Sequence, residues 1–147
     1  AAISRFSLQT SARNQWFGTV TARDNLQIQQ HVEILLADGT TRLKAAITAQ
    51  SAERLGLDEG KEVLVLLKAP WVNITRNPDT AQAADNQLSG AISHIERGKA
   101  QCEVLMTLAD GQSLCATVPC SEADGLEEGA VVTAYFNADR VIIATLC

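Results

Sequence analysis

The sequence predicts an all-β protein made of two tandem five-stranded barrels, each with one short helix. Three observations lead to this prediction. The length of 147 residues suffices for one mid-sized domain or two small ones. Three short segments recur in the same order in the second half of the chain, which indicates an internal repeat. Within each copy, apolar and polar residues alternate as they do in half-buried β-strands.

The repeated segments set the boundaries of the two predicted domains. Each segment contains a glycine, and the spacing before the third segment is three residues shorter in the second copy. Because residues 77–85 have the composition of a linker, we predict one domain over residues 9–76 and another over residues 81–146. The matching segments are residues 14–18, 37–39 and 56–60 in the first copy and residues 86–90, 109–111 and 125–129 in the second.

The first copy illustrates the expected order of elements. A short helix is predicted over residues 51–57, with Ser51 as its N-cap and Gly56 at its C-terminal stop. Five strands and one helix in so small a unit are typical of the partly open OB-type barrel. The strands are predicted over residues 16–20, 27–36, 41–47, 62–67 and 72–74.

The net charge limits the kind of partner. The chain has 12 Lys and Arg against 17 Asp and Glu, a formal charge of −5 at neutral pH. A broad basic surface for nucleic acid is therefore not expected, and the few aromatic residues (Phe 3, Trp 2, Tyr 1) disfavour an OB-type module that stacks single-stranded bases. An anion site in this chain must be local, built from one or two cations together with hydroxyl and backbone donors.

Several features indicate a cytoplasmic protein. The first residues lack the apolar core of a signal peptide and an initiator methionine, so the chain is expected to be a fragment or a processed product. No apolar run approaches the roughly 20 residues of a membrane span. Disulfides would leave the first half of the chain without any cross-link, so reduced thiols are favoured over a disulfide framework. The cysteines are Cys102, Cys115, Cys120 and Cys147, and with His31 and His94 they match no zinc-ligand spacing.

The sequence also predicts that the protein is not an enzyme. Neither His31 nor His94 has a Ser or Cys partner motif, and both are interpreted as solvated histidines. The carboxylates gather in turns such as Asp58-Glu59, where charge is usually solvated. No glycine-rich phosphate-binding motif occurs in the chain.

Three local groups combine cations with short hydrogen-bond donors. Arg13 follows the hydroxyls of Thr10 and Ser11, and its planar fork of donors suits an oxyanion. Thr48 and Ser51 lie at the start of the predicted helix, where backbone N–H groups are available. Lys68 follows the most apolar strand. Each group taken alone also has a structural explanation: an exposed arginine, a simple N-cap, or a chain returning to water.

Comparison of the two copies distinguishes these groups from the shared framework. Arg13 has Ala84 or Asp85 near its equivalent place, and Lys68 is replaced by Asn137. Thr48 and Ser51 are expected to fall where the second copy is shorter. The shared residues are turn and core positions, so the divergence indicates one type of site, centred on the first copy.

Four motifs in the first copy resemble the Mop (molbindin) family. They are residues 11–15, 47–51, 55–60 and 67–69, and the tandem arrangement is similar to the C-terminal molybdate-binding region of bacterial molybdate-responsive transcriptional regulators. The resemblance implies tandem OB-type Mop domains, a homodimer, and molybdate or tungstate bound as a ligand at the dimer interface, with no directly coordinated metal ion. By position, the implied donors are Ser11, Arg13, Thr48, Ser51, Lys68 and the backbone N–H of Ala69.

Two functions remain open on this basis. The first is a sensor domain that regulates transcription through an N-terminal DNA-binding domain outside this chain. The second is a stand-alone intracellular protein for molybdate storage or homeostasis. One departure from the resemblance is Ala69-Pro70, where many relatives have a second small hydroxyl residue after the lysine. The second copy departs further, so no donor is assigned to it.

Overall fold

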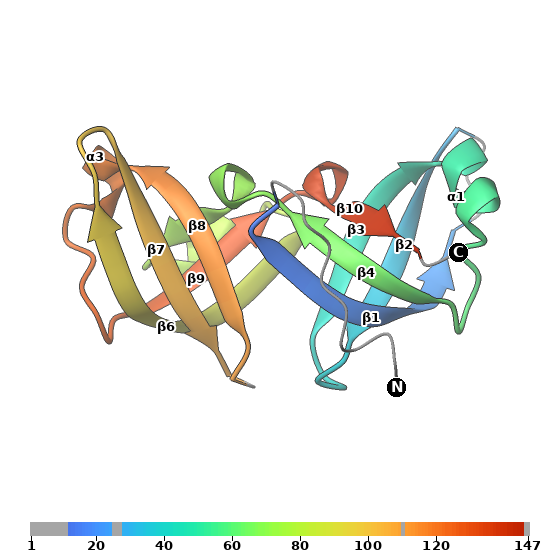
Figure 1. The fold of residues 1–147 in the computed structure, drawn as a ribbon, viewed down its shortest axis with the longest axis horizontal. Coiled ribbons are helices and arrows are strands. Elements are labelled where there is room, and N and C mark those ends of the chain that lie inside the picture. The colour runs from blue at the N-terminus through green and yellow to red at the C-terminus, as the bar shows by residue number, and fades with distance from the viewer. Residues whose placement is uncertain (1–11, 25–27, 110, 146–147) are drawn as a thin grey trace. The chain divides into compact units, whose positions relative to one another are not determined.

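The computed structural model describes residues 12–24, 28–109 and 111–145 of the chain. These residues form two compact units, each built on a five-stranded antiparallel sheet (Figure 1). The first unit combines the chain up to Leu67 with the part from Asn137 onward, and the second unit is Lys68–Phe136. The predicted all-β class with two OB-type barrels is confirmed. No helix among the described residues is long and apolar enough to cross a membrane.

The sheet of the first unit has the strand order β10-β4-β1-β2-β3. A seven-residue helix, α1 (Ala49–Leu55), follows β3, and a short 3-10 helix, η3 (Ala138–Arg140), precedes β10. The strands are β1 (Asn14–Arg23), β2 (Gln29–Leu36), β3 (Arg42–Thr48), β4 (Glu62–Leu67) and β10 (Ile142–Ala144).

The sheet of the second unit has the equivalent order β5-β9-β6-β7-β8. Its strands are β5 (Asn73–Thr75), β6 (Asn86–Arg97), β7 (Gln101–Leu108), β8 (Ser113–Pro119) and β9 (Val131–Phe136). Its helices are η2 (Ala69–Trp71), α2 (Pro78–Ala81) and α3 (Cys120–Ala123). Helices α2, η2 and η3 are not predicted by the sequence pattern.

The last strand of each repeat belongs to the other repeat's sheet. β5 follows β4 in the chain but pairs with β9, whereas β10 pairs with β4. The compact units therefore differ from the sequence repeats of residues 9–76 and 81–146, because β4 and β9 each pair on one side with a short strand of the other repeat. Neither sheet can be completed by one contiguous repeat.

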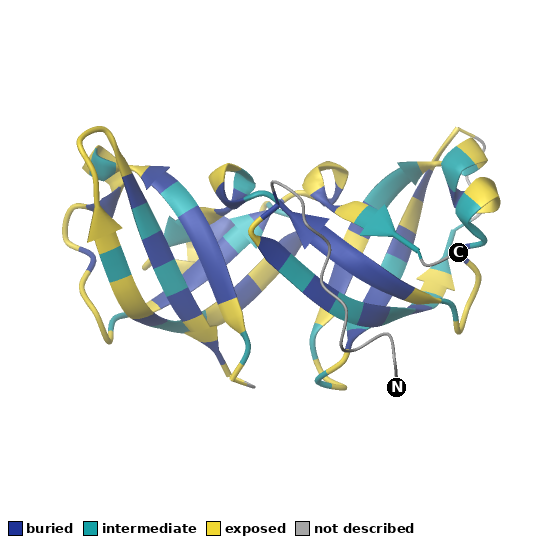
Figure 2. Cartoon of the chain, in the orientation of Figure 1, coloured by how far each residue is buried: buried dark blue, intermediate teal, exposed yellow. Residues whose placement is uncertain are grey.

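Apolar residues fill the core of each unit; burial alternates along strands such as β1 and β7, whereas β4 is buried at five consecutive positions, Val63–Leu67 (Figure 2). The glycine of the repeated Asn-Gln-x-x-Gly segment has a packing role. A Cβ on Gly18 would lie 2.6 Å from Ile34 Cγ2, and one on Gly90 would lie 2.4 Å from the carbonyl oxygen of Thr107. Close approach of the neighbouring strand excludes any larger residue there.

The start of the first unit's helix differs from the prediction. Helix α1 begins at Ala49, and its N-cap is Thr48, not Ser51. Thr48 ends β3 in an extended conformation, so its Oγ1 can accept a hydrogen bond of 3.2 Å from the N–H of Ser51. The predicted stop is confirmed, because Gly56 has a left-handed φ of 66° and its N–H bonds back to the last turn.

Candidate functional site

Arg13 and Lys68 lie next to a paired position in the first sheet. The pairing of β1 with β4 reaches Asn14 opposite Leu67. Arg13 immediately precedes Asn14 and Lys68 immediately follows Leu67, so both cations come at the same end of these two strands. Asn14 is only 3% exposed, and its Nδ2 donates a 3.2 Å hydrogen bond to the carbonyl oxygen of Leu67. This bond holds together the strand ends that carry the two cations.

The segment after β4 orients the lysine. Lys68 is the extended N-cap of η2, and its carbonyl oxygen accepts a 3.0 Å hydrogen bond from the N–H of Trp71. Its Nζ lies 5.2 Å from the centroid of the Trp71 ring, within the range of a cation–π interaction. Ala69 is buried and is the first residue of η2, where the backbone N–H has no partner within the helix.

Thr48 and Ser51 lie at the opposite end of the same sheet. Thr48 pairs with Gln29 at the start of β2, whereas Gly18 of β1 pairs with Leu36 at the end of β2, and β1 begins four residues before Gly18, at Asn14. Strand β1 has 10 residues, which corresponds to about 30 Å along the strand. One copy of the chain therefore does not bring Arg13 and the Thr48–Ser51 pair around a single small oxyanion. Ser11, the remaining predicted donor, lies outside the described residues.

The second repeat has different residues at the equivalent positions. The η helix after its fourth strand is capped by Asn137 instead of Lys68, and its α3 helix is capped by Pro119 instead of Thr48. Pro119 makes no side-chain capping hydrogen bond. Thr48 thus has a structural counterpart, contrary to the expectation that it falls in the deletion. The missing residues instead shorten two elements of the second repeat. One is the turn before β8, and the other is helix α3, which has 4 residues where α1 has 7.

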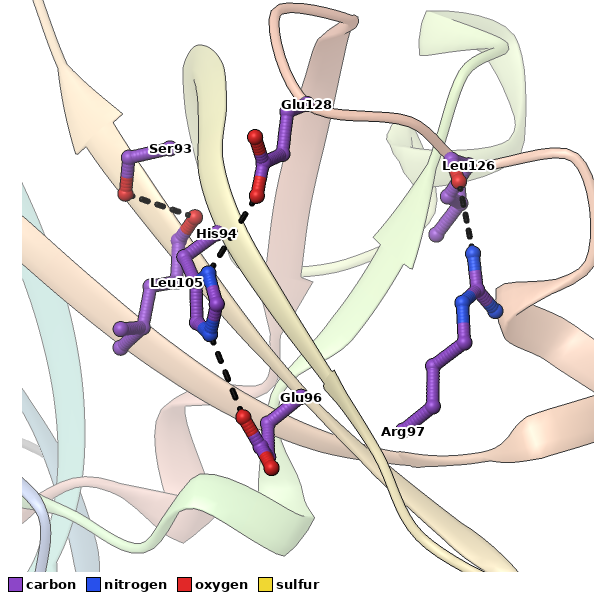
Figure 3. Close-up of polar contacts among 7 residues, drawn as sticks. All are labelled: Ser93, His94, Glu96, Arg97, Leu105, Leu126 and Glu128. Atoms are coloured by element: carbon purple, nitrogen blue, oxygen red, sulfur yellow. Dashed lines mark hydrogen bonds and ion pairs between the residues drawn. The ribbon is translucent and has the colours of Figure 1, made fainter.

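His94 of the second unit is held between two carboxylates (Figure 3). Its Nδ1 lies 3.3 Å from Glu128 Oε1, and its Nε2 lies 3.3 Å from Glu96 Oε2. These hydrogen bonds, to Glu96 first and then to Glu128, raise the pKa of His94 above 6.5. Nearby, Arg97 donates a 3.2 Å hydrogen bond to the carbonyl oxygen of Leu126. Together the contacts tie the loop before β9 to β6.

This cluster was interpreted from the sequence only as a solvated histidine. The sequence contains no local signal for this cluster, because Glu128 and His94 on β6 are far apart in the chain and meet only in the fold. His94 keeps 51% of its side chain exposed, and both ring nitrogens face carboxylates, so the arrangement is an ion-pair network. Among residues 12–24, 28–109 and 111–145, no group of three or more His, Cys, Asp and Glu side chains is placed to hold a metal ion.

Comparison with known proteins gives concordant matches in sequence and structure. The sequence matches the TOBE domain family twice, over residues 10–74 and 82–143. It is 76% identical over 147 residues to the DNA-binding transcriptional dual regulator ModE of Escherichia coli (strain K12), covering 100% of this chain and 56% of that protein. It is 62% identical over 149 residues to the transcriptional regulator ModE of Yersinia pestis, covering 100% of this chain and 57% of that protein.

A solved structure shares the tandem fold. The cytoplasmic molybdate-binding protein ModG, crystallised with molybdate bound, superimposes with a TM-score of 0.90 at 34% sequence identity. The match covers 95% of this chain and 100% of that one. The chain spans about half the length of the ModE proteins it matches. These matches agree with the resemblance inferred from the motifs, and the chain belongs to the TOBE domain family.

Proposed function

We propose that this chain is the molybdate-sensing region of a molybdate-dependent transcriptional regulator. The observation that carries the proposal is the division of the motif residues between the two ends of one sheet, in a fold shared with a protein that was crystallised with molybdate. The ligand site then consists of Ser11, Arg13, Lys68 and Ala69 from one copy and Thr48 and Ser51 from a second copy.

The donor set matches the chemistry of a tetrahedral dianion. Arg13 and Lys68 supply two positive charges, and the hydroxyls and backbone N–H groups supply directional donors. Each charge-assisted hydrogen bond contributes roughly 1.5–3 kcal/mol. A handful of them suffices for sub-micromolar binding, at about −8 kcal/mol or better. Sulfate has the same charge, so discrimination against it rests on the size of the site.

A site shared between copies explains how ligand binding becomes a signal. An oxyanion held by donors from two subunits stabilises the dimer, and it favours the relative position of the subunits that completes the site. Homodimerisation is therefore part of the proposal. The ModE relatives are named as DNA-binding or transcriptional regulators, and we assign DNA contact to the portion of such a regulator that this chain does not span. We place this regulator in the cytoplasm.

Storage or homeostasis of molybdate is the second candidate, and one observation favours it. ModG is described as a cytoplasmic molybdate-binding protein, and this chain covers all of it. The two candidates differ in stoichiometry, because a sensor needs about one oxyanion per chain and a storage protein binds more. Neither candidate is an enzyme.

Calorimetric titration with molybdate, tungstate and sulfate, together with the mass in solution, tests the proposal. We expect a dimer that binds about one molybdate or tungstate per chain with sub-micromolar affinity, and sulfate at least tenfold more weakly. Binding of several molybdate ions per chain supports storage. A flat molybdate titration excludes both functions.

A further inference from the structure

Two cysteines of the second unit lie on one face of neighbouring strands. Cys102 of β7 pairs with Val118 of β8, and Cys120 follows Val118 by two residues. The N–H of Cys120 donates a 3.0 Å hydrogen bond to the carbonyl oxygen of Ala100, so the strand pairing continues to the start of α3. Since side chains alternate along paired strands, Cys102 and Cys120 are diagonal neighbours on the same side of the sheet.

We propose that Cys102 and Cys120 form an oxidisable dithiol that closes reversibly to a disulfide and so fixes the start of α3 to β7. The proposal is independent of the proposed oxyanion site, because neither cysteine is among the assigned donors.

The register places the two thiols beside one another on neighbouring strands. The neighbouring Cys102 thiol raises the pKa of the Cys120 thiol above its ordinary value. The Cα atoms of diagonal neighbours are about 7–8 Å apart, whereas those of disulfide-bonded cysteines are at most about 6.8 Å apart. Cys120 must therefore shift slightly toward Cys102 for the bond to form. The element that must move is the four-residue helix α3, whose N-cap makes no side-chain hydrogen bond. The shift also releases the weak 3.5 Å bond from Cys120 Sγ to the carbonyl oxygen of Gly98.

Exposure determines the order of the reaction. Cys120 is partly exposed, whereas Cys102 is 1% exposed. With a low-molecular-weight disulfide as oxidant, the Cys120 thiolate attacks one sulfur of the oxidant, forms a mixed disulfide and releases one thiolate. The Cys102 thiolate then attacks Cys120 Sγ and releases the second thiolate. Two protein thiols are oxidised, one disulfide is reduced to two thiols, and the two protons pass to the released thiolates.

The remaining described cysteine and the first unit provide contrasts. Cys115 pairs with Leu105 and alternates to the opposite face of β8 from the residue that pairs with Cys102. In the first unit, the N–H of Ala49 donates to the carbonyl oxygen of Ile28 as that of Cys120 does to Ala100. The position equivalent to Cys102 is Gln30, so the same backbone arrangement occurs there without thiols.

The test is incubation of the folded chain with oxidised glutathione, followed by thiol counting and peptide mapping with a glutamate-specific protease. We expect two of the four thiols to disappear and peptides 97–103 and 104–122 to become joined until reductant is added. The rate should rise from pH 7 to pH 9, since the thiolate is the attacking species. The thermal midpoint of the oxidised chain should rise by about 3 °C or more, because the cross-link restricts the unfolded chain.

Matched variants distinguish this pair from other cysteines. Cys115→Ser should keep the joined peptides, and Cys120→Ser, at a partly exposed position, should lose them while remaining folded. Cys102→Ala provides a second loss variant. The proposal is overturned if the folded wild-type chain yields no such link, if the link survives in Cys120→Ser, if it is lost in Cys115→Ser, or if Cys102 instead joins the peptide that carries Cys147.

Discussion

Individual side chains at the strand ends carry the chemistry proposed for this chain. Arg13 and Lys68 adjoin a pair of residues, Asn14 and Leu67, that is fixed by both backbone pairing and a side-chain hydrogen bond. The backbone beside the cations is therefore held in place before any ligand arrives. Pre-organisation of this kind reduces the free energy lost on ordering the site when a ligand binds.

Replacement of either cation should weaken oxyanion binding without unfolding the chain. Arg13→Ala and Lys68→Ala each remove a charge-assisted contact of roughly 1.5–3 kcal/mol, which is a loss in affinity of more than tenfold. Calorimetric titration with molybdate measures this loss, and circular dichroism checks the fold. Arg42→Ala is the matched control, because that arginine lies in an exposed ion pair with Glu33. Unchanged affinity in Arg13→Ala and Lys68→Ala would refute these site assignments.

Tryptophan fluorescence should report ligand binding. Lys68 Nζ lies over the ring of Trp71, so an oxyanion that engages the lysine changes the electrostatic surroundings of that ring. We expect micromolar molybdate or tungstate to change the emission, and sulfate to do so far less. Trp71→Phe should remove most of the change, whereas Trp16, which is 6% exposed, should contribute little. An equal response in Trp71→Phe would assign the signal to Trp16.

His94 should make stability depend on pH in a defined direction. The pKa of His94 in the folded chain is raised above 6.5 by Glu96 and Glu128. Its contribution is therefore complete below pH 6.5 and is lost as pH rises through the raised folded value. Thermal midpoints of wild type and His94→Gln should converge as pH increases from 6 to 8, and NMR titration of the ring should give the raised pKa. Divergence towards higher pH would contradict this assignment.

Among the secondary-structure elements, the junction of β3 and α1 combines a structural role with a proposed binding role. Thr48 ends the strand, caps the helix and belongs to the proposed ligand set, whereas its counterpart Pro119 makes no side-chain cap. Helix α1 is also nearly twice as long as α3. The first repeat thus keeps a well-formed helix start where the proposed site requires hydroxyl and N–H donors.

Removal of the Thr48 hydroxyl should affect both stability and affinity. Thr48→Ala loses the hydrogen bond from the N–H of Ser51, a cost of about 1 kcal/mol. The thermal midpoint should fall by about 2–4 °C, and molybdate affinity should decrease. Thr48→Ser retains the hydroxyl and should preserve most of both properties. If Thr48→Ala and Thr48→Ser behave alike in thermal melting and titration, the hydroxyl has neither role.

For the whole molecule, connectivity and strand direction have separate consequences. The pairing of β10 with β4 and of β5 with β9 makes each sheet depend on both repeats. The antiparallel order of β1, β2 and β3 places Arg13 and Thr48 at opposite sheet ends. The first property couples the folding of the repeats, and the second requires a second copy to complete the proposed site.

Mixed dimers test whether two copies share the site. A dimer of one Arg13→Ala chain and one Ser51→Ala chain should contain one intact site and one doubly altered site. Co-expression with two affinity tags should therefore recover tight molybdate binding at half the wild-type stoichiometry. In the control, a wild-type chain paired with an Arg13→Ala, Ser51→Ala double variant has no intact site and should bind weakly. Tight binding in the control, or none in the first mixture, would place all the donors within one chain.

Much of the architecture was predictable because it is encoded locally. Repeated segments, alternating strands and turn glycines identified two small OB-type barrels, and Gly56 was correctly placed as a helix stop. The predicted N-cap, Ser51, was wrong by three residues. Thr48 and Ser51 both suit a helix start, and the helix begins after Thr48 because β3 ends at that residue. The His94 cluster was missed because Glu128 reaches it only through tertiary packing.

Local chemistry in the chain identified the strands and the candidate donors. The repeat pattern specified the strands, and the divergence between the repeats pointed to Arg13, Thr48, Ser51 and Lys68 as candidates. The pairing partners of β5 and β10 could not be predicted from the sequence, because both strands are short extended segments of similar pattern that fit the edge of either sheet. Only the long-range hydrogen bonds of the folded chain show that β10 pairs with β4 and β5 with β9. The folded sheet likewise separated the candidate donors between its two ends, since that separation depends on strand direction rather than on residue type.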